Sequence, residues 1–134
     1  MTPDVQRSVR FAHVALWTRD LDAAAVFWAT YFGAQVGEPY YSARRPGFVS
    51  RFATLPGEDM QIELMSAPWI SDSAQDAVGW THIALKLGSE AAVDELASRC
   101  DAAGLLASAP RMTGDGFYEA VVKMPDGTPL EITA

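Results

Sequence analysis

Apolar and polar residues alternate along residues 10–17, which predicts a β-strand with two unlike faces. One face is apolar and small, and we expect it to pack against a core. The other face holds a histidine among aromatic and small residues. The residues of that second face are Phe11, His13, Ala15 and Trp17.

Apolar residues then recur three and four positions apart, which predicts an amphipathic helix. Asp20 is a suitable N-cap, and Gly33 suits the position just past the helix end. The helical stripe consists of Leu21, Ala24, Ala25, Trp28, Tyr31 and Phe32. Short strands are predicted near 35–38, 47–55 and 60–66, with a polar, aromatic loop from Pro39 to Pro46 between the first two.

The second half of the chain repeats this order of elements. A strand over 80–87 precedes Ser89, a suitable N-cap, and a helix that Gly104 closes. The stripe of that helix consists of Val93, Leu96, Ala97 and Cys100. Further strands are predicted near 105–108, 117–124 and 129–133. Each half is therefore predicted to be a strand, a helix and three strands.

Landmarks of the two halves keep an offset of 69 residues as far as Pro56 and Pro125 and of 68 residues after them, which indicates an internal repeat. His13 lies 69 residues before His82, Glu63 follows His13 by 50 residues, and Glu131 follows His82 by 49. Further matches join Phe11–Leu16 to Trp80–Leu85, Gly47-Phe48 to Gly116-Phe117, Pro56 to Pro125, and Ile62–Leu64 to Leu130–Ile132. We therefore expect one domain over 1–134, built from a module at about 9–66, a connector at 67–79 and a second module at about 80–134.

Composition and charge narrow the classes of function. The chain has 134 residues, 49% of them apolar and 20% charged, which is typical of a globular domain. Ten Lys and Arg against 17 Asp and Glu give a net charge of −7, which disfavours nucleic acid as a partner. The single cysteine, Cys100, fits a reducing compartment, and no signal peptide or membrane-spanning run is evident. We expect a soluble, cytoplasmic protein that acts on a small molecule.

The two histidines, and the glutamate that follows each of them, are the candidate functional residues. Each half places one His and one Glu on the sheet face opposite its apolar residues. Two such sheets facing each other would gather two imidazoles and two carboxylates, a donor set suited to Zn²⁺, Ni²⁺, Co²⁺ or Fe²⁺. A single histidine on a strand is more often a hydrogen-bonded structural residue, but the matched positions of all four favour a metal site.

This arrangement resembles the vicinal oxygen chelate superfamily, which includes glyoxalase I, extradiol dioxygenases, fosfomycin-resistance enzymes, methylmalonyl-CoA epimerase and bleomycin-resistance proteins. The resemblance spans about residues 9–133. It rests on His13–Leu16, Arg19–Leu21, Phe27-Trp28, Tyr31–Gly33, Trp80–Ala84, Gly116–Tyr118 and Pro125–Glu131. The resemblance implies an α+β fold in which two βαβββ modules form a cleft-like, curved mixed sheet around a metal ion.

The order of the ligands favours one branch of that superfamily. Glyoxalase I uses His, Glu, His and Glu, which His13, Glu63, His82 and Glu131 match in order. Dioxygenases and fosfomycin-modifying enzymes use His, His and Glu, and bleomycin-type binders lack the metal set. The epimerase has Gln in the second place, and Gln61 lies on the same strand face as Glu63.

The resemblance to glyoxalase I implies a lyase or isomerase acting on a methylglyoxal–thiol hemithioacetal or a similar oxygenated substrate. The metal would polarise an oxygen of the substrate, Glu131 would move the proton, and Glu63 would act on the other face. Ser66–Trp69 replaces the Asn-Trp pair of glutathione-dependent glyoxalases, so any thiol cosubstrate stays open. The alternatives are an Fe(II) extradiol dioxygenase, a thiol transferase, or a small-molecule binding or antibiotic-resistance protein.

Several other residues are candidates for the substrate pocket. The loop arginines Arg44, Arg45 and Arg111 are suited to hold an acidic substrate, although solvated arginines are more common in loops. Trp17 and Trp80 lie on the predicted faces of the two histidines. Exposed sheet edges lead us to expect a homodimer, in which either chain or both chains supply the metal ligands.

Overall fold

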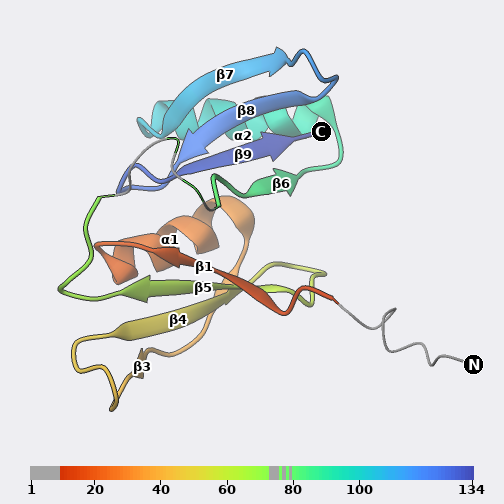
Figure 1. Cartoon of the computed structure of the whole chain (residues 1–134). Helices are drawn as coiled ribbons and strands as arrows, with labels where there is room; N and C mark the ends of the chain where they lie inside the picture. The colour runs from red at the N-terminus through yellow and green to blue at the C-terminus, as the bar shows by residue number, and fades with distance from the viewer. Residues whose placement is uncertain (1–9, 73–75, 77, 79) are drawn as a thin grey trace, which may run out of the picture. The chain divides into compact units, whose positions relative to one another are not determined.

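The computed structural model describes residues 10–72, 76, 78 and 80–134 (Figure 1). The chain divides into two compact units, Met1–Ile70 and Ser71–Ala134, which we describe separately. Residues 73–75, 77 and 79 of the predicted connector lie outside the described residues, as do residues 1–9.

The first unit contains one helix and one mixed sheet. The sheet has the strand order β1-β5-β4-β2, and β3 pairs with β4. β1 runs parallel to β5, whereas the other neighbours are antiparallel. The elements are β1 (His13–Trp17), α1 (Leu21–Phe32), β2 (Gln35–Val36), β3 (Tyr40–Tyr41), β4 (Val49–Thr54) and β5 (Gln61–Ser66).

Both ends of α1 are formed by the residues that the sequence indicates. The Asp20 carboxylate accepts a hydrogen bond from the backbone N–H of Ala23 at 3.0 Å. At the other end Gly33 adopts a left-handed conformation with φ of 66°, and its N–H donates to the carbonyl of Ala29. A residue with a Cβ resists that conformation, so glycine ends the helix there.

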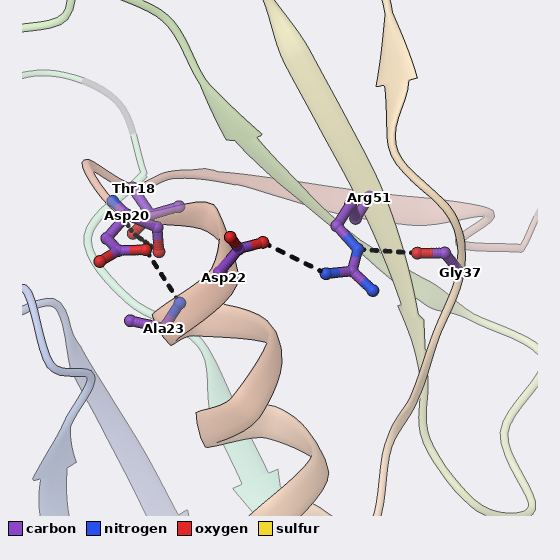
Figure 2. A network of polar contacts seen from close by, with 6 residues as sticks. All are labelled: Thr18, Asp20, Asp22, Ala23, Gly37 and Arg51. Atoms are coloured by element: carbon purple, nitrogen blue, oxygen red, sulfur yellow. Dashed lines mark hydrogen bonds and ion pairs between the residues drawn. The ribbon is translucent and has the colours of Figure 1, made fainter.

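Polar contacts tie the start of α1 to the sheet (Figure 2). Arg51 on β4 donates through Nε to the carbonyl of Gly37 at 2.8 Å, and its Nη1 lies 3.6 Å from Asp22 of the helix. Thr18 is buried and contacts Asp20 through its hydroxyl. This network fixes the turn between β1 and α1 relative to β4.

The core of the first unit lies between α1 and one face of its sheet. Its fully buried side chains include Trp28 from the helix, Ile62 and Leu64 from β5, and Ala53 from β4. Because strand residues alternate between faces, Gln61, Glu63 and Met65 of β5 lie on the opposite, open face.

The second unit repeats this plan with one strand fewer. Its sheet has the order β6-β9-β8-β7, with β6 parallel to β9 and the other neighbours antiparallel. The helix α2 packs on β7, β8 and β9. The elements are β6 (Ala84–Lys86), α2 (Glu90–Ala102), β7 (Leu106–Met112), β8 (Tyr118–Lys123) and β9 (Pro129–Thr133).

The core of the second unit is also formed against its helix. Ser89 caps α2 by accepting from the N–H of Ala92 at 3.1 Å. The predicted helical stripe is buried, and Leu130 and Ile132 of β9 are buried beneath it. The prediction of an α+β fold made of two such modules is confirmed.

The largest differences from the predicted strands are at four places. β1 begins at His13 instead of residue 10, and β6 begins at Ala84 instead of residue 80. β7 extends to Met112, and the predicted loop Pro39–Pro46 contains the two-residue strand β3. Among the described residues, no helix is long and apolar enough to cross a membrane.

Candidate metal centre

In the first unit the structure brings His13 and Glu63 together. Glu63 on β5 lies opposite Ala15 of β1, so His13 lies two residues before the partner of Glu63 and on the same open face. The Nε2 atom of His13 is 3.6 Å from Oε1 of Glu63. The imidazole is 48% exposed and the carboxylate 18% exposed, so the pair is accessible from the open face.

Phe52 lies beside both members of this pair. It lies opposite Glu63 on β4, and its ring meets the His13 ring edge to face with centroids 5.6 Å apart. Gln61, which shares the strand face with Glu63, instead donates its amide N–H to the hydroxyl of Thr54 at 3.0 Å. In this structure the residue next to the His13 imidazole is therefore Glu63, and the Gln61 amide bonds to β4.

In the second unit the structure brings His82 and Glu131 together. Their Nε2 and Oε2 atoms are 3.0 Å apart, with the imidazole 43% and the carboxylate 24% exposed. The Thr81 hydroxyl lies 2.9 Å from Nδ1 of His82, so it fixes the ring with Nε2 toward the carboxylate. Such a contact to the second ring nitrogen is typical of histidines that bind metals through Nε2.

The two pairs have the same strand register. Glu131 lies opposite Ala84, so His82 also lies two residues before the partner of its glutamate. The similar spacings of 50 and 49 residues therefore correspond to equivalent positions in three dimensions within each unit. This equivalence is stronger support for a shared chemical role than either pair alone.

His13 and His82 differ in one local respect. The N–H of Gln61 donates to the carbonyl of Ala12, which brings His13 into β1. The equivalent residue in the second unit is Pro129, which has no N–H. In the second unit the backbone N–H of Glu131 donates to the carbonyl of Ile83. The pairing of β6 with β9 therefore begins after His82, and His82 precedes β6.

Glu119 lies next to Glu131, and the comparison of the two halves of the sequence did not identify it. Partial burial raises the pKa of Glu119, and the charge of Glu131 and a hydrogen bond with it raise this pKa further, while Arg111 opposes the change. At the corresponding position the first unit has the buried Ser50, so the internal repeat gave no signal. The alternation of β8, with Glu119 two residues before Val121, could have placed it on the open face.

The donor atoms fit a divalent metal ion of borderline softness. Two imidazole nitrogens and two carboxylate oxygens are the ligand types that Zn²⁺, Ni²⁺, Co²⁺ and Fe²⁺ accept. Among the described residues, no group of three or more His, Cys, Asp or Glu side chains is arranged so that it could hold a metal ion. Each unit thus supplies one His–Glu pair, that is, two donors.

The predicted pocket residues have different surroundings. Arg45 stacks over Trp69 and Phe48, whereas Arg111 donates to the hydroxyl of Ser108 at 3.1 Å. Trp17 lies on the open face with His13, as predicted, and Trp80 is 97% exposed.

The sequence profile described as Glyoxalase/Bleomycin resistance protein/Dioxygenase superfamily matches residues 10–132. The chain belongs to this superfamily. Its members typically bind divalent metal ions, and they bind small molecules. The resemblance inferred from the sequence, including the assignment to the vicinal oxygen chelate superfamily, is confirmed.

Three similar proteins illustrate the range of this superfamily. An uncharacterized protein of Pseudomonas aeruginosa is 35% identical over 106 residues, covering 78% of this chain and 72% of its own length. The structure of lactoylglutathione lyase from Agrobacterium tumefaciens has a TM-score of 0.65 at 22% identity, covering 94% and 92% of the two chains.

The third protein is the fosfomycin resistance protein FosX from Listeria monocytogenes, whose mutant structure contains Mn(II) and a dihydroxypropylphosphonic acid. It has a TM-score of 0.67 at 21% identity, covering 95% of this chain and 93% of its own. At these identities the two solved structures support only the fold of this chain. Its activity has to be argued from its own residues.

Proposed function

We propose that this protein is a divalent-metal-dependent lyase or isomerase of the glyoxalase I type. The observation that supports this most strongly is the equivalent His–Glu pair in each unit, at 3.6 Å and 3.0 Å. A carboxylate beside each imidazole matches the ligand order of glyoxalase I and exceeds the single carboxylate expected for a His, His, Glu site.

In this proposal His13, Glu63, His82 and Glu131 together hold one metal ion, through residues of one chain or of two chains in a homodimer. The bound ion would act as a Lewis acid that makes the neighbouring C–H of an oxygenated substrate more acidic. His13 and His82 would serve as neutral nitrogen donors, and the Thr81 contact to Nδ1 would keep His82 oriented for that role.

Glu131 is the proposed general base, which takes a proton from one substrate carbon and returns it to the next. Its partial burial limits competition from water, and Phe52 shields Glu63 similarly in the first unit. Glu63 would act on the opposite face of the substrate. The proposed substrate is a methylglyoxal–thiol hemithioacetal or a similar small oxygenated compound, and the single buried cysteine fits a cytoplasmic location.

A turnover assay with a metal-loaded protein tests this proposal. Methylglyoxal is mixed with glutathione, cysteine or coenzyme A, and hemithioacetal loss is followed after loading with Ni²⁺, Zn²⁺ or Co²⁺. We expect turnover with at least one thiol and a loss of about 100-fold or more in Glu131→Gln, the usual range for a general base. The matched control, Glu95→Gln, changes an exposed glutamate on α2 and should retain full activity.

Two outcomes would contradict the proposal. One is a metal-loaded protein that turns over no hemithioacetal, and the other is a Glu131→Gln variant with unchanged turnover. Oxygen uptake with catechol by the Fe²⁺-loaded protein would instead favour the dioxygenase alternative.

A further inference from the structure

We propose that the open face of the first sheet continues from His13 and Glu63 into a subsite that binds an aromatic carboxylate group of the substrate. The subsite consists of Trp17, Phe48, Trp69 and Arg45, and we call it the Arg45 subsite. This inference rests on the proposed function, because it places the reacting end of the substrate at the His13–Glu63 pair.

The strand register places Trp17 close to that pair. Trp17 lies two residues beyond Ala15, the partner of Glu63, on the same face of β1. Two residues of a strand span about 7 Å, the length of a small aromatic ring with one substituent. A substrate of that size can therefore contact Glu63 and Trp17 at once.

Aromatic side chains form the walls of the Arg45 subsite. Phe48 precedes β4 in the alternating series that contains Phe52, and its ring meets the Trp17 ring edge to face with centroids 5.9 Å apart. Trp17 is 41% exposed and Trp69 is 47% exposed, so both indoles are accessible to a ligand. Exposed indole surface of this kind binds flat aromatic groups through stacking and edge contacts.

The guanidinium of Arg45 lies against these rings. It is 4.9 Å from the centroid of Trp69 and 5.6 Å from that of Phe48. These stacking contacts hold the planar group while leaving N–H groups at its edge available. The backbone N–H of Arg45 also donates to Ser42 Oγ, and its carbonyl accepts from the N–H of Phe48.

The loop that bears Arg45 is packed tightly against the segment before Trp69. Gly47 has φ of 96°, and a Cβ at this position would lie only 3.0 Å from Cδ of Pro68. The positive φ favours glycine at position 47, and the close approach of Gly47 to Pro68 brings the two walls of the subsite together. Arg45 is therefore held by the backbone of its loop as well as by the rings of Trp69 and Phe48.

The charge of Arg45 has no carboxylate to balance it within the part of the chain that the structure describes. Arg10 pairs with Asp59 and Arg51 with Asp22, but the contacts of the Arg45 side chain are aromatic. A guanidinium edge is suited to a carboxylate through two parallel hydrogen bonds. Placed beside exposed indole surface, this cation favours a ligand that joins an aromatic ring to a carboxylate.

Binding of 2-naphthoate to the metal-free protein, followed by calorimetry and tryptophan fluorescence, tests the subsite without any turnover. We expect naphthoate to bind at least about tenfold more tightly than neutral 2-naphthalenemethanol, and acetate to bind more weakly than both. Arg45→Gln should weaken naphthoate about tenfold and leave naphthalenemethanol unchanged. Trp17→Leu should weaken both aromatic probes.

Arg10→Gln is the matched control, because it removes an exposed arginine of the first unit that pairs with Asp59, and it should leave naphthoate binding unchanged. The Arg45→Lys variant keeps the positive charge but loses the planar guanidinium with its two parallel N–H donors. It should bind naphthoate with intermediate affinity. Equal binding of the charged and neutral aromatic probes, or equal losses in the Arg10 and Arg45 variants, would overturn the proposal. Because no metal is present, these results are independent of whether the proposed lyase activity exists.

Discussion

Glu63 and Glu131 occupy equivalent positions in their units, but their neighbours differ. Glu63 lies opposite Phe52, whereas Glu131 lies opposite Val121 and near Glu119. The sequence was sufficient to place both glutamates beside their histidines, because strand alternation and a constant offset decide the face. The internal repeat gave no indication of Glu119, and strand alternation alone could place it on the open face but not beside Glu131, because that contact depends on how β8 and β9 are paired.

Tyr118 provides a residue-scale prediction about pH. Its hydroxyl donates to Asp94 of α2, and this hydrogen bond, with burial and nearby carboxylates, raises the pKa of Tyr118 above its usual value of 10.0. The folded state thus favours the protonated phenol. The stabilisation is complete below about pH 10 and is lost as the pH rises through the folded-state pKa.

We therefore expect the wild-type protein to be more stable than Tyr118→Phe, by an amount that is constant from about pH 7 to 9 and decreases above about pH 10. Urea unfolding at a series of pH values measures this difference. Tyr41→Phe, which alters an exposed tyrosine, is the control and should show no such trend. A difference that stays constant above pH 11 would rule out this role for the Tyr118 hydroxyl.

Cys100 gives a second residue-scale prediction. Burial raises the pKa of its thiol more than the neighbouring Arg99 lowers it, and the side chain is fully buried. Because the thiolate is the reactive form, the folded protein should react with a disulfide reagent at pH 8 only on the timescale of unfolding. Ellman's reagent with and without urea measures this, and rapid labelling of the folded protein would contradict the burial of Cys100.

At the scale of elements, the two helices were the most predictable parts of the chain. Their apolar stripes, Asp20 and Ser89 as caps and Gly33 as terminator are all local signals. Strand ends were less predictable because they depend on partners distant in sequence. The predicted residues before Ala84 are not part of β6, since Pro129 has no backbone N–H to donate to the carbonyls at the start of that segment.

β7 shows the same dependence on pairing. The predicted strand near 105–108 ends before Pro110, yet β7 continues to Met112. β7 is the edge strand of its sheet, and its register shifts between Ser108 and Arg111, where Pro110 lies. A proline is tolerated at such an irregular edge because no partner needs its missing N–H.

The cap of α2 provides an element-scale prediction. Ser89→Ala removes the hydroxyl that accepts from Ala92, so it should reduce the free energy of unfolding by about 1 kcal/mol. Ser98→Ala is the matched control, because Ser98 is exposed within the same helix and alanine is favoured there. Urea denaturation of both variants measures the two effects. An equal or opposite effect of the two substitutions would show that the cap contributes little.

At the scale of the whole molecule, the internal repeat was the most informative feature of the sequence. It predicted two units of the same plan and one His–Glu pair in each, and the structure contains both pairs. The substrate was less predictable, because the contacts that we propose for it lie partly in the loop 42–48, which has no helical or strand periodicity. Our central claim is that the two pairs serve a single metal ion.

Metal titration of the stripped protein tests that claim most directly. Calorimetry with Ni²⁺ or Zn²⁺ should give one tight site per chain, and His13→Ala and His82→Ala should each weaken it by at least about 100-fold. Glu95→Gln should bind like the wild-type protein. Two independent sites per chain, no tight site, or a site that survives either histidine substitution unchanged would contradict a single metal centre built from both pairs.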